Sequence, residues 1–156
     1  ARPALTYIDF DVPESLALTS YYLLKSFPHL SFLLYGEEEL MQGLRAKFNV
    51  ILMPVFELRQ VPGKSVDLTF SSHTMSNLSP TAMDEYMNEI ARMTRKCFLY
   101  IGEGSASVSL IAFIRKKYPS LTLLEECLLE WNNQKFVNAK EVECLYKIGG
   151  IGAGSA

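Results

Sequence analysis

The stretch that decides the fold is VDLTFSSHTMSNL, residues 66–78. Its first half is an apolar run typical of a strand, and its second half consists of small polar residues and one histidine, His73. In an open α/β sheet, ligands bind beyond the carboxyl ends of the strands, so the residues after Phe70 stand where a site would form. The stretch therefore predicts a strand that delivers His73 to a functional site.

A helix and another strand follow this stretch. Ser79 and Pro80 are typical of a helix start, because serine caps the first turn and proline has no amide hydrogen to leave unpaired. Apolar side chains then recur at helical spacing, which indicates a packed face, and residues 97–101 favour a further strand. Strand, helix and strand make a βαβ unit. The helical face consists of Met83, Tyr86, Met87, Ile90, Met93 and Thr94.

The same alternation precedes residue 66. The predicted strands cover residues 5–10, 30–35 and 50–53. A helix is expected between the first two strands, starting at Pro13 and stopped by Pro28, and another over residues 37–48. Strands that alternate with helices predict a Rossmann-like, doubly wound α/β fold with a mostly parallel sheet and helices on both faces. Whether the strands at 5–10 and 66–71 are neighbours is left open.

The pattern changes after residue 101. We expect a flexible loop at residues 102–105 and a helix at 108–118 that ends at Pro119. Residues 121–129 are too long and too apolar a run for an exposed strand, and residues 141–148 alternate like a strand that returns beside them. The polar residues 131–134 would connect the two strands. The sheet is therefore predicted to end in an antiparallel pair.

Size and composition suit one globular α/β domain, residues 1–148, with a flexible glycine-rich tail at 149–156. The net charge is −2 and no basic run is present, which argues against nucleic acid as a partner. No apolar run approaches the roughly 20 residues that span a bilayer, and no signal peptide is recognisable, so a cytoplasmic protein is expected. The widely spaced Cys97, Cys127 and Cys144 predict buried free thiols and no metal site.

Four side chains at predicted strand ends are candidates for chemistry. Asp9 and Asp11 follow or end the first strand, where an acid could bind a ribose hydroxyl, although Asp11 could equally cap the next helix. The His73 imidazole could take a proton from a substrate hydroxyl, or His73 could be an ordinary loop residue. Glu103 could be its partner or a substrate contact, because its strand should neighbour the one that ends at His73, or it could be a solvated acid.

Three short motifs give the chain a family resemblance. They are DVP at residues 11–13, MPVFE at 53–57 and SHTMS at 72–76, each directly after a predicted strand. In this order the chain resembles class I S-adenosylmethionine-dependent methyltransferases, and more narrowly bacterial sugar O-methyltransferases. The likeness covers about residues 5–148. It implies S-adenosylmethionine as cofactor and a small-molecule acceptor, such as a sugar.

The resemblance also implies roles for individual residues. Asp11 would bind the cofactor ribose, and residues 53–56 would lie along the adenine. Residues 71–75 would face the methyl group, with His73 as the general base. The implied cofactor-binding residues are Asp11, Met53, Pro54, Phe56, Ser71 and Ser72.

One part of the family pattern is absent from this sequence. The family's first strand, its glycine-rich turn and the following helix should precede residue 5, so we expect this chain to be the C-terminal part of a longer protein. Methyl transfer to a hydroxyl of a sugar or other small polar molecule is the leading hypothesis. A non-catalytic Rossmann-like binding or assembly module, or another nucleotide-using α/β enzyme, remains open. A homo-oligomer is also compatible with the sequence.

Overall fold

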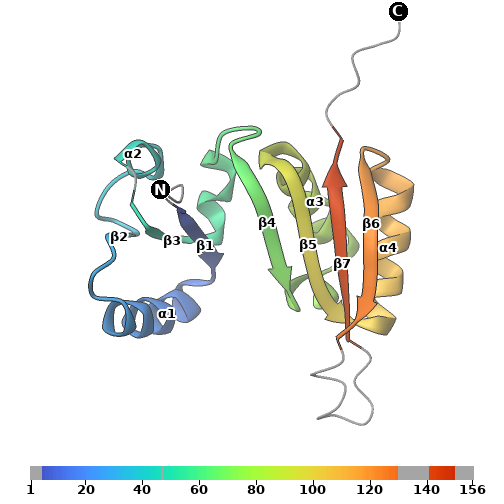
Figure 1. Cartoon of the computed structure of the whole chain (residues 1–156), viewed down its shortest axis with the longest axis horizontal. Coiled ribbons are helices and arrows are strands. Elements are labelled where there is room, and N and C mark those ends of the chain that lie inside the picture. Colours follow the sequence, from blue (N-terminus) through green and yellow to red (C-terminus); the bar gives the residue numbers. More distant parts are fainter. Residues whose placement is uncertain (1–4, 47, 130–140, 150–156) are drawn as a thin grey trace, which may run out of the picture. The chain divides into compact units, whose positions relative to one another are not determined.

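The computed structural model describes residues 5–46, 48–129 and 141–149 (Figure 1). The chain divides into two compact units, Ala1–Pro62 and Gly63–Ala156. We call them the first unit and the second unit. Each has its own described sheet, of three strands in the first unit and four in the second. The predicted connection at residues 131–134 and the tail from residue 150 onward lie outside the described residues.

The sheet of the first unit is entirely parallel. It consists of β1 (Tyr7–Asp11), β2 (Phe32–Leu34) and β3 (Val50–Pro54), in the order β1-β3-β2. All five residues of β3 are buried, as expected for an apolar strand with a neighbour on each edge. Asp11 pairs with Pro54 in register, so the carboxyl ends of β1 and β3 lie at one edge of the sheet.

Three helical segments belong to the first unit. They are α1 (Pro13–Ser26), α2 (Leu40–Ala46) and the short 3-10 helix η1 (Val55–Gln60). Leu16 of α1 packs on β3 and forms the centre of a small apolar core. Helix α2 begins later than predicted, because residues 35–38 form a turn and a bend in which the Glu37 carboxylate accepts a hydrogen bond from the Leu34 amide.

The sheet of the second unit is mixed. Its strands are β4 (Val66–Ser72), β5 (Thr94–Glu103), β6 (Leu121–Leu128) and β7 (Glu141–Ile148), in the order β4-β5-β7-β6. Strands β4 and β5 are parallel, whereas β7 is antiparallel to both β5 and β6. The predicted antiparallel pair is confirmed, and β7 also joins that pair to the parallel strands.

Two long helices of the second unit lie on one face of this sheet (Figure 1). They are α3 (Pro80–Met93) and α4 (Gly104–Lys117), and a short 3-10 helix, η2 (Thr74–Asn77), precedes α3. Ser79 caps α3 as predicted, because its hydroxyl accepts a hydrogen bond from the amide of Ala82. The predicted apolar face of α3 is buried at Met87, Ile90 and Met93.

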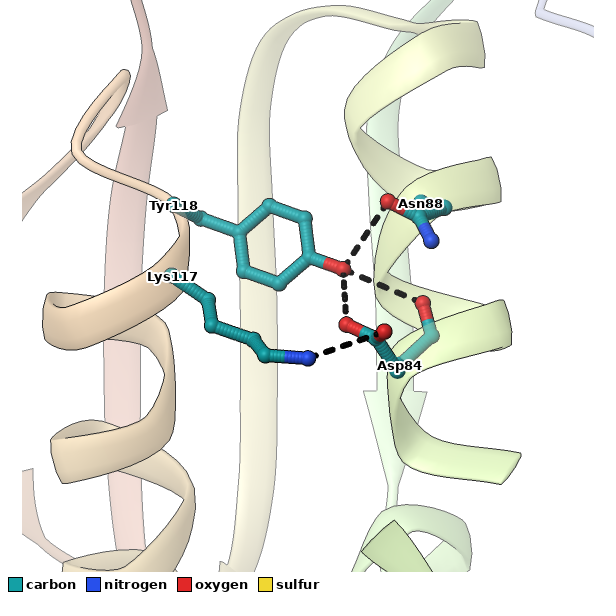
Figure 2. Close-up of polar contacts among 4 residues, drawn as sticks. All are labelled: Asp84, Asn88, Lys117 and Tyr118. Atoms are coloured by element: carbon teal, nitrogen blue, oxygen red, sulfur yellow. Dashed lines mark hydrogen bonds and ion pairs between the residues drawn. The ribbon is translucent and has the colours of Figure 1, made fainter. Parts of the chain in front are cut away.

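A polar cluster joins α3 to the end of α4 (Figure 2). The Tyr118 hydroxyl lies 2.8 Å from Asp84 Oδ1, 3.1 Å from the Asp84 carbonyl oxygen and 3.0 Å from Asn88 Oδ1. Lys117 Nζ donates to the second Asp84 oxygen at 3.0 Å. Burial, followed by the hydrogen bond to Asp84, raises the pKa of Tyr118 well above its ordinary value. We call these four residues the helix clamp.

Several local predictions in the second unit were wrong. Residues 102–105 are not a loop, because β5 runs through Glu103 and α4 begins at Gly104. Glycine and small residues are tolerated in a first helical turn, where the amide hydrogens have no helical partner. Strand β6 is largely exposed, with Leu124 at 54% and Leu128 at 62%. As the edge strand it has only β7 beside it.

The three cysteines are free thiols, as predicted, but only one is buried. Cys144 on β7 is buried, Cys97 is half-buried and Cys127 on β6 is exposed. Burial raises the pKa of the Cys144 thiol to about 11, with Glu126 adding to the effect. Cys127 is exposed for the same reason as Leu124 and Leu128, because β6 is the edge strand of the sheet. None of the helices in the described part of the chain is long and apolar enough to cross a membrane.

Candidate functional site

The backbone of His73 has an unusual conformation directly after β4. Its φ is 62° and its ψ is −20°, in the left-handed region that few residues other than glycine adopt. The His73 amide donates to the carbonyl oxygen of Ile101 on β5 at 2.8 Å, which extends the β4–β5 pairing by one residue. Such conformations cost on the order of 1–3 kcal/mol and cluster at functional sites. The strain makes His73 the first residue to consider for function.

Both ring nitrogens of His73 have partners. Nδ1 lies 2.8 Å from Ser72 Oγ, and Nε2 lies 2.9 Å from Glu141 Oε1. His73 is 50% exposed and the Glu141 side chain 12% exposed. An ionised carboxylate accepts a hydrogen bond only from a protonated nitrogen, so in neutral imidazole Nε2 carries the hydrogen and Nδ1 has the free lone pair. The Ser72 hydroxyl therefore donates its hydrogen to the Nδ1 lone pair.

The sequence pointed to Glu103 as a partner of His73, but the ring contacts Glu141. The two acids lie side by side on adjacent antiparallel strands, because Glu103 is the last residue of β5 and pairs with Glu141, the first residue of β7. Glu103 itself is exposed. The expected neighbour relation of β4 and β5 is confirmed. Sequence reasoning missed Glu141, although the predicted antiparallel return strand began at that residue.

The second unit thus contains a hydroxyl, an imidazole and a carboxylate in a hydrogen-bonded row. In such a row the carboxylate fixes the ring orientation and stabilises the imidazolium that forms when the ring takes a proton. The row ends at the carboxyl end of β4, on the side of Ser72. Ser71, the neighbouring candidate, pairs with Tyr100 and is half-buried on the alternate side of the strand. This arrangement is suited to removing a proton from a hydroxyl.

In the first unit, Asp11 lies at the carboxyl end of β1. Its Oδ1 accepts a hydrogen bond from the Val12 amide at 2.7 Å, while Val12 is the N-cap of α1 and no side chain caps that helix. In the structure, Asp11 therefore does not act as a conventional cap of α1. Asp9 points to the same side two residues earlier, and burial together with the charge of Asp11 raises its pKa.

An aromatic pair lies beyond the ends of β2 and β3. Tyr35 follows β2, Phe56 lies in η1, and their rings meet edge to face with centroids 5.6 Å apart. Both are exposed, at 57% and 59%. Met53 is 1% exposed and Pro54 is also buried, so of the predicted adenine segment 53–56 the structure exposes Phe56 and not these two residues. Tyr35 was not among the sequence candidates, although it is the last residue of a predicted strand.

The predicted site residues therefore fall into two groups, one in each unit. Within the first unit the structure brings together the ends of β1 and β3, and within the second unit it brings together the end of β4 and the start of β7. The first group is Asp11, Met53, Pro54 and Phe56, and the second is Ser71, Ser72, His73 and Glu103.

Comparison with known proteins identifies the fold. No family model matches the chain, and no curated protein matches its sequence. Among solved structures, it is similar to a Sulfolobus solfataricus protein assigned to the type 11 methyltransferases, with 12% identity, a TM-score of 0.51 and coverage of 97% of this chain and 88% of that one. A chain from the complex of the Haloferax volcanii Trm112 methyltransferase activator with a methyltransferase has 13% identity, a TM-score of 0.54 and coverage of 97% and 86%. The chain thus has the Rossmann-like α/β fold of these methyltransferases, and the predicted fold class is confirmed.

Proposed function

We propose that this protein transfers a methyl group from S-adenosylmethionine to a hydroxyl of a sugar or another small polar molecule. The observation that carries the proposal is the row from Ser72 Oγ through the His73 ring to Glu141. A base held in this way is what transfer to an unactivated hydroxyl requires. The methyltransferase fold supports the class of cofactor.

The first unit has groups that suit the nucleoside part of this cofactor. The Asp11 carboxylate is an acceptor for ribose hydroxyls at the carboxyl end of a parallel strand, the usual place for such an acid. The exposed rings of Tyr35 and Phe56 offer apolar surface for adenine. Met53 and Pro54 are buried and would support this surface from beneath. These residues are chemically compatible with an adenosine ligand.

The second unit supplies the proton chemistry. When bound, S-adenosylmethionine supplies a methyl group on a positively charged sulfur, which keeps the C–S electron pair as the acceptor oxygen forms its new bond to carbon. His73 Nδ1 takes the acceptor's hydroxyl proton, either directly in the place of Ser72 Oγ or through the Ser72 hydroxyl. Glu141 retains the Nε2 hydrogen bond and stabilises the imidazolium. His73 then releases its proton to water.

Methyl transfer to a panel of acceptors tests this proposal. The acceptors would be sugars, phenols and carboxylic acids, assayed with methyl-labelled S-adenosylmethionine. We expect transfer to hydroxyl acceptors, and a loss of about 10²- to 10⁴-fold in turnover for His73→Asn. Asparagine is chosen because it tolerates the left-handed backbone of residue 73 better than alanine does.

The control is His29→Asn, which removes the other histidine of the sequence, an exposed residue of the first unit. Turnover of His29→Asn should equal that of the wild type. Full turnover in His73→Asn would show that the histidine is structural. Transfer to none of the acceptors would reject the proposed reaction.

A further inference from the structure

Helix α1 has an exposed apolar stripe on the side away from its own sheet. Leu18 is 75% exposed, and Tyr21 and Tyr22 are each 66% exposed. At 3.6 residues per turn, Leu18 and Tyr21 lie opposite Leu16, which packs on Val50 in the core of the first unit. Large apolar side chains gathered on one helix face are typical of an interaction surface. This stripe needs a partner that the described part of its own unit does not supply.

The stripe carries opposite charges at its two ends. Glu14, Leu18, Tyr21 and Lys25 are separated by four, three and four residues, the spacing of the seam between two packed helices. Glu14 and Lys25 are both exposed. Lys25 Nζ donates to the Tyr21 hydroxyl at 3.0 Å and lies 5.2 Å from the centre of that ring, so its charge is held on the stripe. The stripe therefore has an acidic side chain, Glu14, at one end and a basic side chain, Lys25, at the other.

We propose that this stripe binds the same stripe of a second copy of the chain, with the two α1 helices antiparallel. A two-fold axis between residues 19 and 20 places Leu18 opposite Tyr21 of the partner subunit and Glu14 opposite Lys25 of the partner subunit. Ala17 then faces Tyr22 of the partner subunit, a small side chain against a large one. Parallel helices would place Glu14 against Glu14 of the partner subunit and lose both ion pairs.

The expected dimer is weak and salt-dependent. One helix pair buries less than the roughly 1,200 Å² at which specific stable interfaces begin, so dissociation in the micromolar range or above is expected. The two ion pairs lie at the rim of the contact, where salt screens them. The inference rests on the surface of α1 alone and does not depend on the proposed function.

Sedimentation velocity of the full chain over a range of concentrations tests the dimer. In a dimer of Glu14→Lys alone, Lys25 of each subunit would face a lysine of the partner subunit. In a dimer of Lys25→Glu alone, Glu14 of each subunit would face a glutamate of the partner subunit. We expect each variant to dimerise about 5- to 30-fold more weakly, because two exposed ion pairs become like-charge pairs. An equimolar mixture of the two variants should regain dimers, because each variant supplies the charge that the other needs. Recovery in the mixture would also show that both variants fold.

Substitutions of two exposed leucines by glutamate complete the experiment. Leu18→Glu should weaken the dimer by more than tenfold, because it places a charge in the centre of the stripe. Leu124→Glu, at an exposed leucine on β6, should leave association unchanged. A wild-type chain that stays monomeric into the high micromolar range would overturn the proposal. So would association that is insensitive to the α1 substitutions or is lost in Leu124→Glu.

Discussion

The two units differ in how their helices pack on the sheet. In the second unit, α3 and α4 cover one face of a four-stranded sheet and the helix clamp fastens them to each other. In the first unit, α1 packs on a sheet of three short strands around a small core, and α1 and the Tyr35–Phe56 pair leave large apolar side chains exposed. The second unit also exposes large apolar side chains, at Leu124 and Leu128 of β6, but more of its described side chains are buried. We therefore expect the second unit to be the more stable scaffold, and it is the unit that holds the strained histidine.

The largest test of this comparison removes one core side chain from each unit. Phe98 on β5 is 0% exposed and stacks on Tyr146 with ring centroids 5.9 Å apart, whereas Leu16 is 8% exposed. Phe98→Ala should lower the free energy of unfolding by about 3–5 kcal/mol, and Leu16→Ala by about 2 kcal/mol, the low end for such truncations. Urea unfolding followed by circular dichroism gives both values. Equal losses, or a larger loss for Leu16→Ala, would mean that the first unit has the stronger core.

A second test concerns how the second unit holds His73, the proposed base. Glu141→Gln should lower turnover about 10-fold, less than loss of His73 itself, because the ring stays but its imidazolium loses a negative partner. The matched control is Glu143→Gln, two residues along the same side of β7. An identical effect of the two substitutions would remove the special role of Glu141.

The smallest effect is expected at the helix clamp. Tyr118→Phe removes hydrogen bonds to Asp84 and Asn88 and should cost about 1 kcal/mol of stability near neutral pH. Because the pKa of Tyr118 is raised in the folded chain above its ordinary value of 10.0, this contribution is present below pH 10.0 and is lost as the pH rises further. Unfolding measured from pH 7 to above 10 should show the wild type and Tyr118→Phe converging.

Tyr22→Phe is the control for the clamp, because it removes the hydroxyl of an exposed tyrosine that lies outside the clamp. Its stability should follow that of the wild type across the same pH range. A constant difference between the wild type and Tyr118→Phe at all pH values would contradict the assignment of the alkaline loss to Tyr118.

The elements of the fold were largely predictable because their signals are local. Helix α3 follows from the cap at Ser79 and the periodic apolar face, and β3 from a short apolar run that ends at Pro54. The antiparallel final pair followed from alternation in β7. The exposure of β6 was not predictable, because it depends on which strand takes the edge of the sheet and not on the composition of β6 itself.

Only part of the candidate site could be predicted from the sequence. The place of His73 after a strand is a local signal, but its contact with Glu141 joins residues 68 positions apart. That contact exists because β7 lies next to β5 and starts where β5 ends, a matter of strand order. In the first unit, Asp11 was identifiable by position, whereas the pairing of Tyr35 with Phe56 depends on β3 lying beside β2.

The most direct test of the proposed function is calorimetric titration of the chain with S-adenosylmethionine, with NAD and ATP for comparison. We expect saturable binding of S-adenosylmethionine in preference to the other two. Asp11→Asn should weaken it about 10- to 100-fold, the value of hydrogen bonds to a charged group. His73→Asn and Asp67→Asn, which removes a surface carboxylate paired with Arg95, should leave the affinity unchanged. No binding, a preference for NAD or ATP, or full affinity in Asp11→Asn would contradict it.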